Sequence, residues 1–213
     1  MYLCKIVVEG NCSLSALSSR VSRPILLTSV FVVNKEMNSL TGLIHSKKVD
    51  ETRREFALDF VNLNIMKDSK GMFFNGVKRD HGIIKSIIDG GNTPLFPVVI
   101  KEDKEIFTFL SRSVRDAEKA KTNAQSHNKV ENLQIYKATY NSFASNVDNY
   151  RVLQLILTPK ESEILKIFYD AGYFQWPRKN NLASVSKKIG VSKPTASYHL
   201  RNVEYKLMGI LFS

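Results

Sequence analysis

The sequence has few of the residues that build metal or disulfide sites. Its 213 residues include two cysteines, Cys4 and Cys12, and four scattered histidines. The cysteines are eight positions apart, without a C-x-x-C pair or a neighbouring histidine, so a disulfide framework or a zinc site is not expected. We predict that both are buried free thiols. No histidine belongs to an H-E-x-x-H pair, and we predict no metal site.

Motifs of enzymatic chemistry are also absent from the sequence. No G-x-S-x-G nucleophile turn occurs, and no glycine-rich phosphate loop opens a helix. The pair Gly90-Gly91 stands where a helix is expected to end. The carboxylates Asp50 and Glu51 stand at a predicted helix start, where a solvated surface is the ordinary role. We therefore predict a protein that is not an enzyme and carries no cofactor.

Long apolar runs are missing. No stretch approaches the roughly 18 apolar residues that a membrane-spanning helix needs. The start, MYLCKIVVEG, alternates apolar and polar residues like a strand and lacks the apolar core of a signal peptide. A hydrophobic content of 43% is ordinary for a globular protein. These features predict a cytoplasmic protein without a membrane partner.

Acidic residues are scarce, and the imbalance is local. The chain has 31 Lys and Arg against 20 Asp and Glu, a net charge of +11. Seven basic residues and one acid, Glu204, fall between Arg178 and Lys206, so this stretch holds +6 of that charge. A generally lysine-rich surface, as in thermophiles, would not predict such a concentration. A surface that binds nucleic acid would predict this concentration of positive charge.

The same stretch has the periodicity of a helix-turn-helix. Leu182–Ile189 places Leu182, Val185 and Ile189 on one helical face, and Gly190 follows where a left-handed helix end belongs. Ser192 is a good N-cap for a second helix. The apolar stripe of that helix is Ala196, Leu200, Val203 and Leu207. Two helices joined by a short glycine-containing turn are typical of DNA-binding domains.

A further helix is expected in front of this pair. Thr158 and Glu161 form a capping box, with Pro159 at the first helical position. Ile164, Leu165 and Phe168 supply its buried face, and Gly172 ends it. Tyr173 and Trp176, which follow, are predicted to fill the core of so small a domain, although exposed aromatic rings could also stack on bases.

These residues resemble a known family. The run LTPKESEILKIFYDAGYFQWPR, followed by LASVSKKIGVSKPTASYHLRNVEYKL, is similar to the helix-turn-helix domain of archaeal bacterio-opsin activator-type regulators. The resemblance covers Leu157 to Leu207 and includes the AGYF-x-x-PR segment and the GVSKPTASYHLR core. It implies an archaeal transcription regulator, usually an activator, with a variable sensor region in front.

The second helix of the pair is the predicted reading helix. Lys193 and Thr195 in its first turn should meet the major groove first, while Arg201 is suited to a guanine or a phosphate. Tyr198 points away from the apolar stripe and either touches DNA or is a surface tyrosine. The remaining basic candidates are expected to bind phosphates, with a solvated charged face as the alternative for each. The complete set of predicted DNA-binding residues is Arg178, Lys187, Lys188, Ser192, Lys193, Pro194, Thr195, Ser197, Tyr198 and Arg201.

Residues 1–140 are expected to form an α+β sensor or dimerisation region. The strand and helix patterns follow the order β-α-β-β-α-β twice, in 1–67 and 71–140, which predicts tandem ferredoxin-like modules similar in order to amino-acid sensors. No residue-level repeat accompanies this order. The polar stretch 141–156 is the expected linker, and 157–213 is the helix-turn-helix domain.

The function predicted from these patterns is sequence-specific transcription regulation. The expected partners are double-stranded DNA, a second copy of the chain, a small-molecule effector and the transcription machinery. Activation is implied by the resemblance. The alternative is a ligand-sensing module whose basic helices bind RNA or a protein partner; the strands look aliphatic and buried, which does not favour single-strand recognition by a sheet.

Overall fold

The computed structural model describes residues 1–69, 71–79, 82–147 and 157–211. The chain divides into two compact units, Met1–Arg151 and Val152–Ser213. The first holds an antiparallel sheet with helices and the second is helical, which confirms the predicted α+β class. Within the described ranges, no helix is both long enough and apolar enough to cross a bilayer.

The N-terminal unit repeats one order of strands and helices. The first set is β1 (Tyr2–Glu9), α1 (Ser13–Val21), β2 (Ile25–Val32), β3 (Met37–Ile44), α2 (Val49–Phe56) and β4 (Phe60–Lys67). The second set is β5 (Met72–Arg79), α3 (Ile83–Asp89), β6 (Thr93–Lys101), β7 (Lys104–Ser111), α4 (Val114–Gln125) and β8 (Val130–Lys137). The predicted order is therefore present twice.

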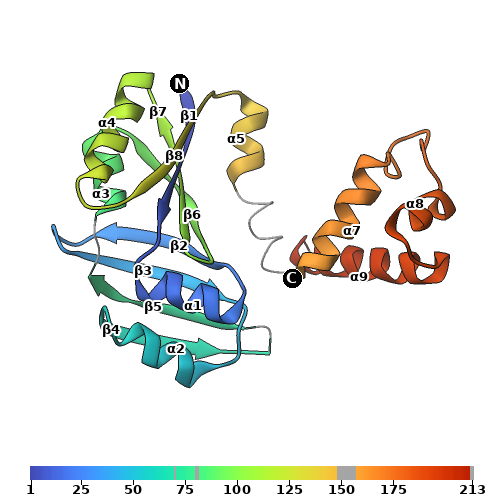
Figure 1. The fold of residues 1–213 in the computed structure, drawn as a ribbon, viewed down its shortest axis with the longest axis horizontal. Helices are drawn as coiled ribbons and strands as arrows, with labels where there is room; N and C mark the ends of the chain where they lie inside the picture. The colour runs from blue at the N-terminus through green and yellow to red at the C-terminus, as the bar shows by residue number, and fades with distance from the viewer. Residues whose placement is uncertain (70, 80–81, 148–156, 212–213) are drawn as a thin grey trace. The chain divides into compact units, whose positions relative to one another are not determined.

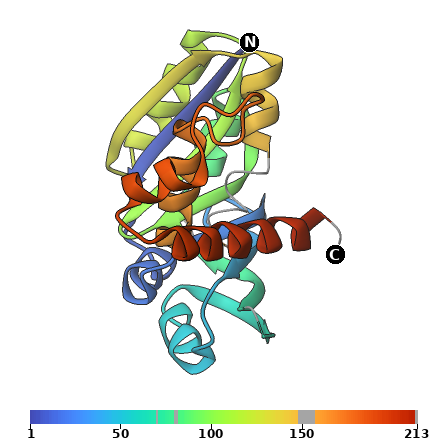
Figure 2. The ribbon, with the colours of Figure 1, turned by 90° about the vertical axis from the view of Figure 1, so that its right-hand side faces the viewer.

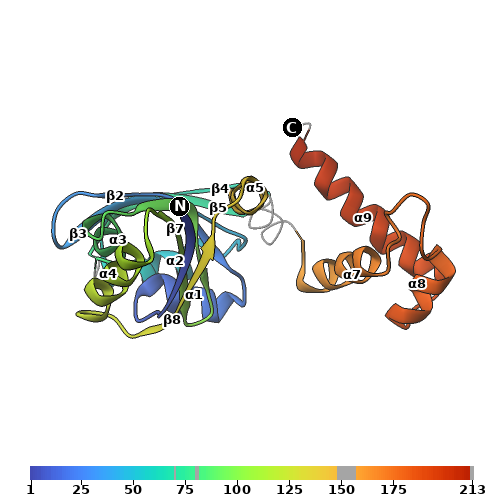
Figure 3. The same ribbon diagram turned by 90° about the horizontal axis from the view of Figure 1, so that it is seen from above.

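All these strands join one sheet. Among the described residues it has eight strands, in the order β4-β5-β3-β2-β6-β7-β1-β8. We call β4-β5-β3-β2 the first half-sheet and β6-β7-β1-β8 the second. They meet where β2 and β6 pair at Ile25–Leu27 and Val98–Ile100. Helices α1 and α2 pack side by side, as do α3 and α4 (Figure 1), and all four lie on one face of the sheet (Figure 3). The contacts of α1 with β6 and of α3 with β2 and β6 place these two helices near the junction of the half-sheets.

The two sets exchange their first strands. In a β-α-β-β-α-β unit closed on itself, the first strand lies between the third and the fourth. Here β1 lies between β7 and β8, and β5 lies between β3 and β4. Each half-sheet is thus completed by a strand from the other set. A boundary between 67 and 71 in the sequence therefore does not separate the two halves of the sheet.

The strand pairing aligns the two sets and shows a residue-level repeat in the outer strands. Because β1 and β5 occupy equivalent places, Tyr2 corresponds to Met72, and the outer strands β4 and β8 correspond at the same spacing of 70 positions. Four identities then align in those outer strands: Asn62 with Asn132, Leu63 with Leu133, Ile65 with Ile135 and Lys67 with Lys137. Our prediction that no such repeat exists was wrong.

A single apolar core lies between the sheet and its helices. Ile6, Phe74, Ile87, Val98 and Phe109 are fully buried in it. The rings of Phe56 and Phe60 stack with their centroids 4.7 Å apart. The alanine stripe of α4, Ala117, Ala120 and Ala124, is also fully buried, because only small side chains let that helix approach the sheet closely.

Both cysteines are free thiols, as predicted, but the predicted burial holds for Cys4 and not fully for Cys12. Cys4 is buried in the core, and burial raises its pKa to about 11. Cys12 is half-buried and donates to Glu105 Oε1 over 3.0 Å. Burial and the neighbouring Glu105 carboxylate raise the pKa of Cys12 to about 12, so both thiols stay protonated at neutral pH.

The polar stretch after β8 is partly helical. Tyr140–Val147 forms α5, although we predicted a linker over 141–156. Thr139 and Ser142 exchange side-chain and backbone hydrogen bonds at its start, which gives these polar residues a capping role. The rest of the predicted linker, 148–156, lies outside the described residues.

The C-terminal unit is built from α7 (Pro159–Asp170), α8 (Leu182–Ile189) and α9 (Lys193–Leu211). The long helix α9 crosses beneath the two shorter ones (Figure 2). The core of the C-terminal unit consists of Ile164, Phe168, Ala171, Val185, Ala196 and Leu200. The predicted stripe residue Val203 is also fully buried, which confirms the face of α9 that turns inward.

Candidate nucleic-acid interface

The first helix of the C-terminal unit begins with the predicted capping box. Thr158 Oγ1 accepts from the Glu161 backbone N–H over 3.2 Å, and Glu161 Oε2 accepts from the Thr158 N–H over 2.7 Å. Lys206 from α9 lies 2.7 Å from both carboxylate oxygens. Burial pushes the pKa of Glu161 upward, but hydrogen bonds from Lys206 and Thr158 outweigh it and hold that pKa below its ordinary value.

The turn between α8 and α9 has the geometry that the glycine predicts. Asn181 caps the start of α8 by accepting from the Ser184 N–H over 3.0 Å. Gly190 ends the helix at φ 76°, and the Val191 N–H returns to the Ser186 carbonyl over 3.1 Å. This is a Schellman ending, which fixes the angle at which the chain leaves α8.

The start of α9 is held by the predicted cap. Ser192 Oγ accepts from the Thr195 N–H over 3.3 Å and shares a 2.7 Å hydrogen bond with the Thr195 hydroxyl. Together with the turn before it, this cap fixes where the first residues of α9 lie. Lys193, Pro194 and Thr195 are all exposed there.

One stripe of α9 faces away from the core. Pro194, Tyr198 and Arg201 lie on it at helical spacing, and Tyr198 is 64% exposed. Tyr205 is 82% exposed and continues the same stripe, although it is not among the predicted DNA-binding residues. Its signal was available, since it stands seven positions after Tyr198 and four after Arg201. Ser197 is only half-buried and lies at the edge of the stripe.

The remaining predicted cations lie around this helix with different environments. Lys187 and Lys188 are exposed in the last turn of α8. Arg178 is exposed in the loop before α8, and its guanidinium carbon lies 4.6 Å from the centre of the Tyr173 ring. Lys206 differs, because its ammonium group binds Glu161 inside the unit. Lys206 of the basic stretch therefore stabilises the fold of the C-terminal unit.

The loop aromatics divide between core and surface. Tyr173 packs against the core, as predicted, with its ring edge-on to Phe168 at 5.0 Å. Trp176 is 95% exposed, so our prediction that it fills the core was wrong. The core needs no further ring, because Phe168 and Tyr173 already close it.

The C-terminal unit is similar to known DNA-binding domains. Residues 157–209 match the family described as "HTH DNA binding domain". A protein of Haloferax volcanii named "Putative transcriptional regulator" is 37% identical over 62 residues. That alignment covers 29% of this chain and 11% of the relative's length. No solved structure matches the chain. The predicted resemblance is thus confirmed for the C-terminal helix-turn-helix region.

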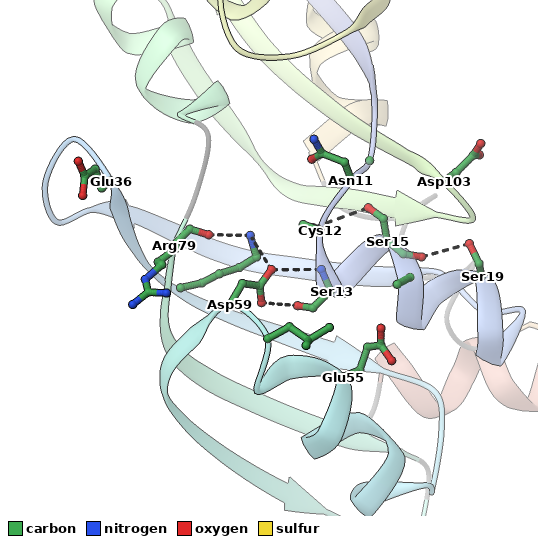
Figure 4. Close-up of a pocket in the computed structure, with 14 residues that line it drawn as sticks. Asn11, Cys12, Ser13, Ser15, Ser19, Glu36, Glu55, Asp59, Arg79 and Asp103 are labelled. Atoms are coloured by element: carbon green, nitrogen blue, oxygen red, sulfur yellow. Dashed lines mark hydrogen bonds and ion pairs between the residues drawn. The ribbon is translucent and has the colours of Figure 1, made fainter.

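The N-terminal unit contains a separate cavity of about 780 Å³. Its walls are the start of α1, the end of α2, the end of β5 and the turn between β6 and β7 (Figure 4). The volume is in the range of small-molecule sites. Among the described residues, no group of three His, Cys, Asp or Glu side chains is arranged to hold a metal ion.

Asp59 connects three of these walls. Its carboxylate accepts from the Ser13 N–H over 3.1 Å, accepts from the Ser13 hydroxyl, and lies 3.4 Å from the Lys78 ammonium group. Lys78 is buried and also donates to the Arg79 carbonyl over 2.9 Å. The charged lining residues are Glu36, Glu55, Asp59, Asp103, Lys78 and Arg79, so the cavity is polar and carries more acids than bases.

Proposed function

We propose that the protein is a sequence-specific regulator of transcription that binds double-stranded DNA as a homodimer. One observation carries this proposal: α9 presents the exposed stripe of Pro194, Tyr198 and Arg201 from a helix-turn-helix with a fixed turn. A reading helix of this kind lies in the major groove with its N-terminal residues against base edges. The match of residues 157–209 to DNA-binding domains supports the same assignment.

The exposed residues then divide into readers and positioners. Lys193, Thr195 and Tyr198 approach the bases, and Arg201 binds guanine or a phosphate. Arg178, Lys187 and Lys188 bind phosphates, and Ser192, Pro194 and Ser197 shape and complete the start of the reading surface. A homodimer places two such helices on half-sites separated by about one helical turn, roughly 34–36 Å, or a multiple of it.

The N-terminal unit is the proposed sensor and dimerisation region. The polar cavity beside Asp59 and Lys78 suits a small polar metabolite, and it involves both sets of the repeat. A ligand that binds one arrangement of these walls better than another shifts the population of the unit. Activation through contact with the transcription machinery is the proposed output, and the protein acts in the cytoplasm, where an archaeal chromosome lies.

The experiment that tests the proposal begins with selection from a pool of random duplexes. We expect a short shared motif, bound more tightly than scrambled duplex or RNA of the same length at the same salt concentration. Equal binding to RNA would favour the alternative of an RNA-binding module. Chromatin immunoprecipitation in the native cells should recover the motif upstream of one gene set.

Two variants separate reading from positioning. Arg201→Ala should cost about 1–3 kcal/mol on the selected motif and relax the preference at one base position. Lys187→Ala should weaken binding to all duplexes alike and lower the slope of log affinity against log salt by about one. If Arg201→Ala leaves sequence preference intact, Arg201 does not read a base.

A further inference from the structure

The two outer strands of the sheet are equivalent in the repeat but differ in chemistry. Among the described residues, β4 and β8 are the strands with a neighbour on one side only. From Phe60 to Met66, β4 carries no charge, whereas β8 carries Glu131 at the position equivalent to Val61. Glu131 also binds Lys104 over 2.8 Å. Charges within an outer strand prevent edge-to-edge pairing, which protects β8. In β4 the only charge is at its last residue, Lys67, and the register shift lies at its start, between Phe60 and Asn62, so the stretch from Asn62 to Met66 has neither protection.

The edge at β4 is also apolar. Val61 is 58% exposed and Met66 is 70% exposed. Beside them lies a recess of about 480 Å³, lined by Leu63, Ile65, Met66 and Phe73 together with Arg53, Asn64 and Asn75. An outer strand with apolar neighbours is a template for another strand.

The helix next to this edge is complementary to itself. Asp50 and Glu51 are in the first turn of α2, and Arg53 and Arg54 are in the last. Asp50, Arg53 and Arg54 are exposed, and Arg53 lines the recess beside β4. If two copies of α2 lie antiparallel, the acidic turn of each helix faces the basic turn of the other. A parallel arrangement would bring like charges together.

We propose that a second copy of this chain docks on β4. The two β4 strands pair antiparallel across a two-fold axis, which joins both sheets edge to edge and sets the α2 helices side by side. The inference rests on the homodimer of the proposed function and adds the surface that forms it. An isologous interface of this kind requires one self-complementary patch, and β4 with α2 provides it.

The first test compares matched variants of the full chain by sedimentation equilibrium without DNA. Val61→Glu with Met66→Glu gives β4 two glutamates. Tyr136→Glu gives β8 the same pair, because Glu131 is already there and Tyr136 is equivalent to Met66. All three side chains are exposed, so folding should be retained, as circular dichroism will check. We expect a dimer for the wild type and for Tyr136→Glu, and a dissociation constant raised at least about tenfold for the β4 variant.

The second test addresses the antiparallel helices. One variant carries Asp50→Arg with Glu51→Arg, and the other carries Arg53→Glu with Arg54→Glu. Each alone should dimerise more weakly, and an equimolar mixture should regain the dimer, because opposite charges then meet at both contacts. A mixture as weak as its components would overturn the α2 arrangement. This result depends on the interface and not on the fold of either variant.

The outcomes also separate this inference from the proposed function. A wild-type monomer, as expected if a foreign peptide occupies β4, overturns the inference, and so does a β4 variant that stays dimeric. If that wild-type monomer still prefers the selected duplex, regulation by DNA binding stands. If the dimer forms through β4 but shows no duplex preference, the interface stands and the proposed function fails.

Discussion

The two units of the chain are held together over very different sequence distances. In the C-terminal unit, residues three positions apart fix each helix start: Thr158 with Glu161, and Asn181 with Ser184. In the N-terminal unit, β1 pairs with Lys104–Ser111 and with Val130–Lys137, about 100 or more positions later. The C-terminal unit can form from local signals, whereas the N-terminal unit requires strands that are far apart in its sequence.

The N-terminal unit depends on the exchange of β1 and β5 between the two sets, so this exchange is the first feature to test. Lys5 lies opposite Gln134 in the sheet. Without the exchange, β1 would take the place of β5, and Lys5 would lie opposite Asn64, as its equivalent Asn75 does. Directly opposite residues of an antiparallel pair are close enough for a disulfide, since their Cα atoms are about 4.5–5.5 Å apart.

The largest expected effect is therefore all or none. In a background with Cys4→Ala and Cys12→Ala, the pair Lys5→Cys with Gln134→Cys should cross-link quantitatively on mild oxidation. The pair Lys5→Cys with Asn64→Cys should not. Non-reducing electrophoresis and peptide mass spectrometry distinguish the two. Cross-linking of the second pair in preference to the first would show that β1 stays within its own set.

The next effect concerns the core of the C-terminal unit. Phe168 of α7 is fully buried and packs against Tyr173, so Phe168→Ala should destabilise this unit by about 3–5 kcal/mol. Hydrogen exchange by mass spectrometry should show loss of protection in peptides from 157–211. Peptides from β1 to β8 should be unchanged if the two units unfold independently. Equal loss in both would mean that they form one cooperative unit.

The ion pair at the start of α7 should matter less. Glu161 is nearly buried and binds both Lys206 and Thr158, so Glu161→Gln should cost about 2 kcal/mol. Glu163→Gln is the matched control, because its 3.3 Å pair with Lys160 is exposed and adds little. Urea unfolding monitored by hydrogen exchange of the α7 peptides compares the two variants.

The same carboxylate gives a pH dependence. Because the folded pKa of Glu161 lies below its ordinary value, the folded state holds this proton less tightly than the unfolded state. The stabilisation is therefore complete above the ordinary glutamate pKa and is lost as pH falls through the folded value. Glu161→Gln should remove that acid-sensitive part. An unchanged acid response in the variant would assign it to other carboxylates.

The smallest effect tests a single backbone angle. Gly190→Ala should destabilise the C-terminal unit by about 1 kcal/mol, because φ is 76°, a backbone angle that alanine adopts with strain. No atom lies within 4 Å of the added Cβ, so a steric clash does not contribute. Gly209→Ala in α9 meets equally open space without a positive φ and should stabilise the helix by about 0.5–1 kcal/mol. Melting curves of the two variants should move in opposite directions. If both are destabilised by equal amounts, backbone angle is not the cause.

The same contrast explains which features the sequence predicts. The caps at Thr158 and Ser192, the ending at Gly190 and the inward stripe of α9 each depend on residues within one or two turns, so local patterns predict them. The exposure of Trp176 depends on whether Phe168 and Tyr173 already fill the core. Local sequence patterns do not predict how a core is filled. The order of β-α-β-β-α-β is likewise local, but the partner of β1 is decided by packing across the whole unit. The cavity beside Asp59 is equally hidden, because its walls come from α1, α2, β5 and the β6–β7 turn.

During synthesis on the ribosome, a delay separates the exchanged strand β1 from its partners. Tyr2–Glu9 is made before its two partners, and the strand that completes its pairing begins at Val130. At roughly 5–20 residues per second, β1 waits about 6–25 s for that partner. A nascent chain stopped before Val130 presents β1 as an open edge, which attracts chaperones and proteases. The helix-turn-helix follows β8 in the sequence, so every chain that acquires it has already been supplied with the eight described strands of the sheet.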